Sequence, residues 1–426
     1  MIARRNTNSA AAFPTRQNHR RNLMPPRQII MAAITALTLA APASAQSDGQ
    51  TPGQRLQRVF ERLDTNGDAK LSDSELQRAP RLAERLAPAD ADADGSLTIE
   101  EIRDHFSAPN NRPDRERSPR RLPPLPELQP AEHPIESGLQ LRAVTADDRL
   151  RRYLVYAPPQ YDPAQPTPVV LAFHGGGGSP QSMIQLSGLN HKADDAGFIV
   201  VYPFGTAPDG SMSYTWNGGQ CCGYAQATNT DDVAFIDTLL DDLANAASTD
   251  PERIYATGMS NGAVLTYRLA NELAHRIAAV APVAGPVGQK SVAPSRAVPV
   301  MHFHGTADEF APFEGGPGAN DQTLFFPVKH SVLQWATANE CDPIPSVRQL
   351  PDTADDDTTV TETRWQDGKN DAEVVLYTIE NGGHTWPGRQ PVADFLGIST
   401  QDISANDLMW AFFTQHPRNL QKPAPN

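Results

Sequence analysis

Residues 253–270 read Arg-Ile-Tyr-Ala-Thr, then Gly258-Met259-Ser260-Asn261-Gly262, then Ala-Val-Leu-Thr-Tyr-Arg-Leu-Ala. The first five residues are typical of a short buried strand, and the last eight carry apolar residues at helical spacing. A G-x-S-x-G pentapeptide between a strand and a helix predicts a sharp turn that exposes the serine above a sheet. Ser260 is therefore the candidate nucleophile. Because a hydroxyl is a poor nucleophile at neutral pH, it needs a base and an oxyanion site.

The segments around this turn predict alternating strands and helices. Unbroken apolar runs such as Val169–Phe173 indicate strands that are buried on both faces. Such alternation predicts an α/β fold with a doubly wound, mostly parallel sheet. The strands are expected at 139–144, 150–156, 169–173, 198–202, 253–257, 277–283, 298–304 and 374–380, and helices at 231–244, 263–270, 329–339 and 406–415.

An oxyanion site is predicted directly after the strand at 169–173. His174 is followed by four glycines, and glycine lets backbone N–H groups approach a developing negative oxygen without crowding. We expect the N–H of Gly175 or Gly176 to act as one donor. The second donor is expected to be the N–H of Asn261, the residue after the nucleophile.

The acid and base candidates follow two later strands. Asp308 lies in His304-Gly-Thr-Ala-Asp308, and His384 lies in a glycine-rich loop. His384 would take the serine proton while Asp308 orients its ring. Asp321 and Asp342 are the reserve acids, whereas His302 and His304 lie within a strand and are expected to have structural roles. The order Ser260, Asp308, His384 is that of an α/β-hydrolase, and its chemistry needs no cofactor.

Several motifs together carry a resemblance to a known family. Residues 139–415 resemble the secreted esterase family that includes poly(3-hydroxybutyrate) depolymerases of the LpqC type and carbohydrate-esterase family 1 feruloyl esterases. This resemblance implies an α/β-hydrolase that cleaves carboxylic esters through Ser260, His384 and Asp308. The matching stretches are 173–176, Cys221-Cys222-Gly223, 231–235, 258–262, 304–308 and Gly383-His384-Thr385-Trp386-Pro387-Gly388.

The ester itself is not determined by these motifs. Trp386, beside the base, and Trp216, before the cysteines, are candidate substrate walls, with ordinary packing as the alternative. The loops at 206–229 and 310–326 are expected to shape the pocket. A feruloyl ester would need a flat aromatic slot, and a hydroxybutyrate ester a smaller and more polar groove. A serine peptidase of the same fold is a further alternative.

Two acidic loops near the N-terminus resemble an EF-hand pair, which would form a small all-α unit over residues 46–107. Each loop supplies oxygen ligands at alternate positions and ends in glutamate, the arrangement that calcium prefers. The second loop has Gly95 at its turn, where the first has Ala69. We expect structural calcium and no calcium chemistry; a calcium-binding surface module with an idle hydrolase body is the alternative. The ligands are Asp64, Asn66, Asp68, Lys70, Glu75, Asp90, Asp92, Asp94, Ser96 and Glu101.

The remaining segments predict the cellular location of the protein and the classes of partner that it does not bind. Residues 1–45 contain six arginines and no acidic residue, and Met24 begins a segment with an apolar run and an Ala43-Ser44-Ala45 site. This indicates a signal peptide and a secreted or periplasmic protein, although a transit peptide is the alternative. No transmembrane segment is expected. The net charge of −14 argues against nucleic acid as a partner.

The sequence also predicts the boundaries of the domains and the possible disulfides. Residues 108–134 are rich in proline and arginine and predict a linker before the hydrolase unit at 135–426. Export permits disulfides, and the chain has three cysteines. Either Cys221 and Cys222 are joined to each other, or Cys341 is joined to one of them.

Overall fold

The apolar run expected at 169–173 forms strand β5 (Thr167–Phe173) in the computed structural model of the chain, and all of its residues are buried. Val169, Leu171 and Phe173 enter one hydrophobic core, whereas Val170 and Ala172 enter a second core. Successive side chains of a strand point to opposite faces of its sheet. A strand covered on both faces therefore needs apolar residues at every position.

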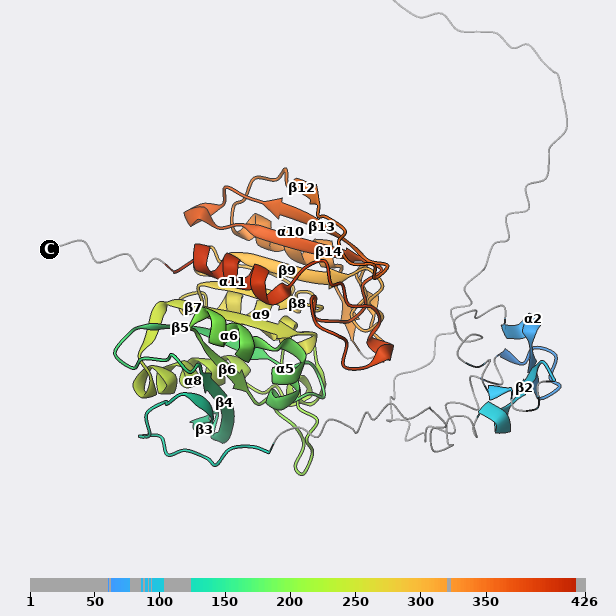
Figure 1. Ribbon diagram of the computed structural model, residues 1–426, viewed down its shortest axis with the longest axis horizontal. Helices are drawn as coiled ribbons and strands as arrows, with labels where there is room; N and C mark the ends of the chain where they lie inside the picture. Colours follow the sequence, from blue (N-terminus) through green and yellow to red (C-terminus); the bar gives the residue numbers. More distant parts are fainter. Residues whose placement is uncertain are drawn as a thin grey trace, which may run out of the picture. The chain divides into compact units, whose positions relative to one another are not determined.

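A ten-stranded sheet is the centre of the larger unit (Figure 1). Its order is β12-β13-β14-β9-β8-β7-β5-β6-β4-β3. The strands from β14 to β6 in this order are parallel, and antiparallel pairs extend the sheet at both edges. Chain order reverses between β5 and β7, because β6 follows β5 on one side and β7 lies on the other. Such a reversal leaves a crevice at the carboxyl ends of the strands.

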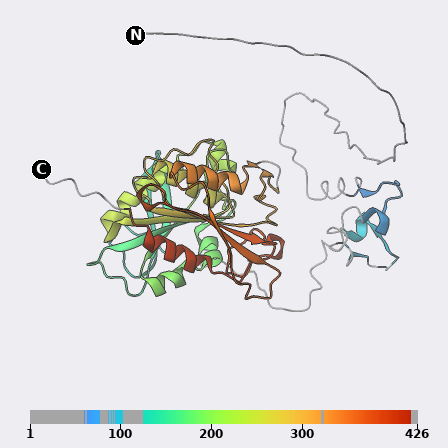
Figure 2. The ribbon, with the colours of Figure 1, turned by 90° about the horizontal axis from the view of Figure 1, so that it is seen from above.

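Helices cover both faces of this sheet, as Figure 2 shows with the sheet seen edge-on. Helices α8, α9 and α10 supply Leu239, Leu269 and Trp335 to the first core. Helices α5, α6 and α11 supply side chains such as Met183 and Phe412 to the second. The doubly wound α/β arrangement expected from the sequence is thus present.

The elements of the larger unit have the following bounds. The strands of the main sheet are β3 (Gly138–Ala146), β4 (Arg149–Ala157), β5 (Thr167–Phe173), β6 (Ile199–Pro203), β7 (Thr249–Met259), β8 (Ala279–Val283), β9 (Val300–Gly305), β12 (Ser346–Gln349), β13 (Thr359–Trp365) and β14 (Val374–Glu380). A small separate pair is β10 (Gly316–Pro317) and β11 (Leu324–Phe325). The helices are α5 (Pro180–Ser187), α6 (Leu189–Ala196), α7 (Gly223–Ala227), α8 (Asp232–Ala246), α9 (Asn261–Glu272), α10 (Val328–Ala338), α11 (Ala405–Gln415) and the 3₁₀ turns η2 (Lys369–Asp371) and η3 (Asp394–Leu396).

Every strand expected from the sequence in the main sheet is present, but β12 and β13 were not expected. Val347 of β12 is 65% exposed, and β13 alternates buried with half-buried residues. These strands lie at the sheet edge, where one face meets solvent. The continuous apolar run that marks a central strand is therefore missing from both.

The smaller unit contains a two-stranded sheet in addition to helix. Strand β1 (Lys70–Ser72) pairs antiparallel with β2 (Ser96–Thr98), with Leu71 opposite Leu97. Helix α2 (Asp73–Leu76) follows β1 directly. Buried side chains such as Phe60, Leu86 and Ile102 pack around the two leucines. The expectation of a unit made only of helices is corrected by this pair, which joins the two acidic loops.

The structure describes residues 60, 63–76, 86, 89, 90, 92, 94–102, 124–319 and 323–418. The segment expected to be a signal peptide lies outside these residues, as does most of the expected linker. The last part of that linker belongs to the larger unit, because Gln129 N donates to Leu141 O of β3 and Arg142 donates to Ala131 O and His133 O. No helix within the described part of the chain is long and apolar enough to cross a membrane.

A buried ion pair ties helix α8 to the sheet. Arg151 of β4 donates to Asp232 Oδ1 at 2.7 Å, and Asn217 N donates to Asp232 Oδ2 at 2.7 Å. We expect Asp232→Ala to lower the free energy of unfolding by about 3–5 kcal/mol, because it leaves the Arg151 charge buried and unpaired. Chemical denaturation measures this. The control Asp241→Ala removes a carboxylate that is 68% exposed from its pair with Arg276 and should cost about 0–1 kcal/mol. Equal losses for both variants would contradict the prediction.

Candidate functional site

The predicted catalytic residues meet at one edge of the sheet. Ser260 follows β7, Asp308 lies three residues after β9, and His384 lies four residues after β14. The glycine loop that starts at His174 follows β5. Because these four strands are parallel, their carboxyl ends face the same crevice. Residues up to 210 positions apart in the chain are thereby brought to one place.

The turn at Ser260 is held in a conformation that side chains rarely adopt. Ser260 has φ 58° and ψ −122°, and its N–H donates to Val283 O of β8 at 2.9 Å. A Cβ at Gly262 would lie 2.3 Å from Phe173 O, and one at Gly258 would lie 2.5 Å from Gly262 O. Glycine is required at both positions because backbone approaches backbone there. The close approach sets the serine beside the end of β5.

Three backbone N–H groups are available as oxyanion donors. Within the glycine loop, Gly177 N donates to Tyr214 O and Gly178 N donates to Gly175 O. The N–H groups of Gly175, Gly176 and Asn261 have no acceptor among the described residues. A Cβ at Gly175 would lie 3.4 Å from Ser260 Cβ, and one at Gly176 would lie 3.6 Å from Asn261 Cβ. The structure thus brings the predicted donors next to the predicted nucleophile.

The ring of His174 anchors the glycine loop. Its Nδ1 bonds Gly175 O at 2.8 Å, and its Nε2 accepts from Gly205 N at 3.1 Å. A carbonyl can only accept and an N–H can only donate, so His174 is neutral and carries its proton on Nδ1. Burial lowers the pKa of His174 to about 4. The sequence analysis treated this residue only as the start of the glycine run.

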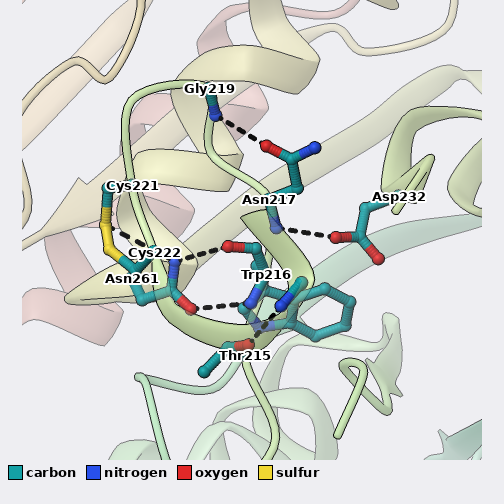
Figure 3. The surroundings of a disulfide bond; sticks show 9 residues. Thr215, Trp216, Asn217, Gly219, Cys221, Cys222, Asp232 and Asn261 are labelled. Atoms are coloured by element: carbon teal, nitrogen blue, oxygen red, sulfur yellow. Dashed lines mark hydrogen bonds between the residues drawn. A yellow bond between two sulfur atoms is a disulfide. The ribbon is translucent and has the colours of Figure 1, made fainter. Parts of the chain in front are cut away.

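The side chain of Asn261 is held by the loop that carries the cysteines (Figure 3). Its amide accepts from Trp216 N at 2.7 Å and donates to Trp216 O at 2.9 Å. Cys221 and Cys222 form a disulfide with each other, and Cys341 is free. Asn261 Nδ2 also lies 3.8 Å from Cys221 Sγ. Of the two pairings left open by the sequence, the structure has the bridge between neighbours, beside an oxyanion donor.

Asp308 and His384 form the expected carboxylate–imidazole pair. His384 Nδ1 lies 2.7 Å from Asp308 Oδ2, and both side chains are buried. Oδ1 of Asp308 accepts from the N–H groups of Phe310 and Ala311 at 2.8 and 2.9 Å. Burial alone would raise the pKa of Asp308, but hydrogen bonds from His304 and His384 hold it well below its ordinary value. The carboxylate is therefore ionised and holds the His384 ring through its Nδ1.

The hydroxyl of Ser260 makes no hydrogen bond to any described residue, and the side chain is half-buried. Catalytic hydrogen bonds are often long in the absence of substrate. Of the reserve acids, Asp342 is an exposed turn residue that accepts from Ile344 N at 2.8 Å. Asp321 lies outside the described residues.

The expectation that Trp216 and Trp386 form substrate walls is wrong. Both rings are almost fully buried, with exposed fractions of 0% and 1%. Trp216 Nε1 donates to His174 O at 3.0 Å, and Trp386 Nε1 donates to Asn406 Oδ1 at 3.0 Å. A buried indole needs a partner for its N–H, and each ring has one inside the protein. Both tryptophans therefore pack inside the protein and hold the loops of the site through these hydrogen bonds.

Two phenylalanines that the sequence analysis did not single out lie near His384: Phe310 packs on the His384 ring, and Phe395 packs on Phe310. The Phe310 ring centroid is 5.1 Å from that of His384 and 6.0 Å from that of Phe395. Phe395 is 70% exposed. Phe310 and Phe395 together form an aromatic surface that starts at the His384 ring and reaches solvent. The sequence could have indicated Phe310 but not Phe395, because only Phe310 lies in one of the two loops expected to shape the pocket.

A groove of about 520 Å³ lies at the same sheet edge. Tyr153 of β4 pairs with Pro203 at the carboxyl end of β6, so the first residues of β4 reach the catalytic edge. Arg152 lies over the Phe204 ring at 4.8 Å. The rest of the lining comes mainly from the expected loop at 206–229 and includes Tyr214 and Tyr224. This loop thus forms a concave surface, as expected.

Three carboxylates of the second acidic loop lie close together. Asp90, Asp92 and Asp94 each place one oxygen within 4.8 Å of the others. Backbone N–H groups hold them, with Gly95 N donating to Asp90 Oδ2 and Ser96 N to Asp94 Oδ1. Glu101 Oε2 accepts from the N–H and hydroxyl of Thr98. This is a set of hard oxygen donors that fits calcium.

The first loop has the same turn with a different residue. Ala69 has φ 63° where Gly95 has φ 78°. Asp64 accepts from Gly67 N and Ala69 N, and Asn66 Nδ2 donates to Asp68 Oδ2 at 2.9 Å. Hydrogen bonds from Ser72 lower the pKa of Glu75 to about 2. Lys70, expected to offer its carbonyl, also pairs its ammonium with Asp94 of the other loop at 2.7 Å.

Comparisons with known proteins place the chain among esterases. The family Esterase PHB depolymerase matches residues 151–316. NocK of Nocardia uniformis subsp. tsuyamanensis, which is described as an esterase, is 33% identical over 58% of this chain and 74% of its own length. Feruloyl esterase B of Piromyces equi is 28% identical over 55% of this chain. The bifunctional acetylxylan esterase/xylanase XynS20E of Neocallimastix patriciarum is 32% identical over 36%. The chain spans 42% and 21% of the lengths of these last two relatives.

The doubly wound sheet and the serine turn at its carboxyl edge define an α/β-hydrolase, and the relatives make it a hydrolase of carboxylic esters. More narrowly, the chain belongs to the same esterase family as NocK, and its residues 151–316 match the family Esterase PHB depolymerase.

The buried neutral ring of His174 makes stability depend on pH. Its pKa is about 4 in the folded protein and about 6.5 when unfolded. Between these values the unfolded chain binds more protons, so the free energy of unfolding should fall by up to about 3 kcal/mol as pH drops from 6.5 to 4. Urea denaturation at several pH values measures this. His174→Gln should flatten the dependence, whereas the control His275→Gln changes an exposed ring and should leave it unchanged. An unaltered slope in His174→Gln would contradict the assignment.

Proposed function

We propose that this protein is an exported serine esterase in which Ser260, His384 and Asp308 act as a triad. The observation that carries the proposal is the buried contact of 2.7 Å between His384 Nδ1 and Asp308 Oδ2, at the same sheet edge as the strained turn of Ser260. This contact leaves His384 Nε2 free to accept a proton. An idle hydrolase body would have no reason to keep such a pair.

The mechanism follows from these positions. Ser260 attacks the ester carbonyl while His384 takes its proton, and Asp308 stabilises the imidazolium that forms. The N–H groups of Asn261 and of Gly175 or Gly176 bind the developing oxyanion, for which backbone donors held in place are well suited. His384 then protonates the leaving alcohol. A water activated by the same ring hydrolyses the acyl-enzyme.

We favour an ester of a flat aromatic acid over a hydroxyalkanoate ester. Phe310 packs against His384, and Phe395 extends the apolar surface to solvent. Offset or tilted stacking on such rings suits a planar aromatic acyl group. The name feruloyl esterase B of one relative points in the same direction. The alternative, a hydroxybutyrate oligomer, draws on the family name and would use the more polar groove beside Tyr214 and Arg152.

Product analysis by mass spectrometry tests both parts of this proposal. The chain from Gln46 onward is incubated with methyl ferulate and hydroxybutyrate oligomers together, with Ser260→Ala as the blank. We expect release of ferulate and a fall of at least about 10³-fold in Ser260→Ala, because the nucleophile is lost. Product formed equally by Ser260→Ala would overturn the mechanism. Release of neither product would favour the idle-body alternative or another ester.

The aromatic wall has its own variant in the same assay. Phe395→Ala should raise KM for methyl ferulate about 10-fold, since it removes one exposed apolar contact surface, and should leave hydrolysis of 4-nitrophenyl acetate unchanged. The control Val392→Ala shortens another exposed apolar side chain and should change neither. If hydroxybutyrate is released and Phe395→Ala has no effect, the aromatic assignment is wrong while the triad stands.

We also propose that the small unit is an EF-hand pair that binds calcium for stability. Ala69 and Gly95 occupy the same left-handed turn, which costs a residue other than glycine about 1 kcal/mol. We expect Ala69→Gly to tighten calcium binding at the first loop by about 5-fold and Gly95→Ala to weaken it at the second by a similar factor. Calorimetric titration of the full chain measures both. Equal affinities in all three proteins would contradict calcium binding by these loops, and the esterase rate should not depend on calcium.

Export is proposed from the sequence alone. The apolar run before Ala43-Ser44-Ala45 supports it, and a disulfide between Cys221 and Cys222 is compatible with an oxidising compartment.

A further inference from the structure

A chain of buried rings continues from the catalytic carboxylate into the core. Tyr267 of α9 bonds His302 Nδ1 at 2.8 Å, and His302 Nε2 bonds His304 Nδ1 at 2.9 Å. His304 Nε2 lies 3.3 Å from Asp308 Oδ2, the oxygen that His384 contacts. All five side chains are buried. Three hydrogen-bonding side chains in series behind one carboxylate exceed what packing alone requires.

The position of this chain follows from strand geometry. His302 and His304 are two residues apart in β9, so their side chains share one face of the sheet. That face lies under α9, which supplies Tyr267. The rings are nearly parallel, with centroids 5.7 Å apart for Tyr267 and His302 and 5.2 Å apart for the two histidines. The sheet thus lines up the rings toward the loop that carries Asp308.

The positions of the protons along this chain of rings are determined by one acceptor, the carbonyl of Ala311. His304 Nε2 bonds the carbonyl of Ala311 at 2.7 Å, and a carbonyl can only accept, so this nitrogen carries a proton. In a neutral ring the Nδ1 of His304 must then accept from His302 Nε2–H. His302 Nδ1 in turn accepts from the Tyr267 hydroxyl. Burial, together with the neighbouring His304, lowers the pKa of His302 well below its ordinary value, which agrees with a neutral ring.

We propose that His304, oriented by His302 and Tyr267, is a positioning residue for Asp308 and shares its charge with His384. Oδ2 of Asp308 receives the Nδ1–H of His384 at 2.7 Å and lies 3.3 Å from His304 Nε2, whose N–H is shared with the carbonyl of Ala311, while Oδ1 receives two backbone N–H groups. This leaves the carboxylate no freedom to rotate away from His384. It also moderates the charge that His384 experiences, because the second imidazole N–H takes part of it.

This inference rests on the proposed triad, yet part of its test needs no activity. Nuclear magnetic resonance of protein with 15N-labelled histidine reports which ring nitrogen carries the proton. We expect His302 and His304 with the proton on Nε2, and His174 and His384 with the proton on Nδ1. A proton on Nδ1 of His302, or a doubly protonated His304 at neutral pH, would overturn the proposed chain whatever the enzyme hydrolyses.

Kinetics of 4-nitrophenyl acetate hydrolysis test the function of the chain. Tyr267→Phe removes one oxygen and should lower kcat about 3- to 10-fold with KM unchanged, the loss expected for one neutral hydrogen bond. The control Tyr255→Phe removes a buried hydroxyl that has no partner among the described residues and should leave kcat unchanged. His304→Leu should lower kcat about 10- to 100-fold, because it removes one hydrogen bond to a charged group. His304→Gln keeps an N–H donor and should recover part of this loss in kcat.

The pH profile separates positioning from general damage. The titratable groups that face His304 are His302 of its own strand, Tyr267 of α9, Asp308, and His384 across the carboxylate. Without the N–H of His304, the full charge of Asp308 acts on His384. We therefore expect the acid limb of kcat/KM to move to higher pH in His304→Leu, which has no N–H donor. An unmoved limb in His304→Leu, with normal kcat in both His304→Leu and Tyr267→Phe, would overturn the proposal, while a normal rate in Asp308→Asn would instead refute the triad itself.

Discussion

The site depends on the contact between the start of helix α9 and the end of strand β5. Gly262 packs so closely against Phe173 that a single methyl group there would meet the Phe173 carbonyl at 2.3 Å. This approach fixes the serine turn beside the glycine loop, and it therefore sets the distance between the proposed nucleophile and its proposed oxyanion donors. A rigid element on each side is what allows donors to be held in place before any charge develops. The strained backbone of Ser260 is maintained by the packing of β7, β8 and α9 around it.

Around this contact, neutral polar groups do most of the positioning. His174 joins the glycine loop to Gly205, and Asn261 is clamped by the backbone of Trp216 beside the bridge between Cys221 and Cys222. Each of these groups is buried and has its hydrogen bonds satisfied, which gives the loops one arrangement in place of several. The two tryptophans that were expected to touch the substrate belong to this supporting layer. The surface that we propose for a ligand is formed by Phe310, Phe395 and the groove at the end of β6.

The buried histidines of β9 illustrate how one strand serves both stability and chemistry. Their alternation places them in the core, where a charged ring would be costly, and the carbonyl of Ala311 determines which nitrogen holds the proton. The same arrangement directs an N–H toward Asp308. The carboxylate of Asp308 is consequently held by groups from both of its neighbouring segments as well as by His384.

The amino-acid sequence by itself determined the parallel sheet, the nucleophile turn and the identity of the acid and base candidates. These features depend on local patterns, namely apolar runs, glycine at a close approach and a fixed order along the chain. It did not reveal the edge strands β12 and β13, the burial of Trp216 and Trp386, or the packing of Phe310 on His384 and of Phe395 on Phe310. Exposure and contact between distant segments arise only when the strands are assembled, because a side chain's surroundings depend on which helix covers which face. The pairing of the cysteines and the contact between His304 and Asp308 also became visible only in the tertiary structure. Both features depend on loop conformations, which residue types do not specify.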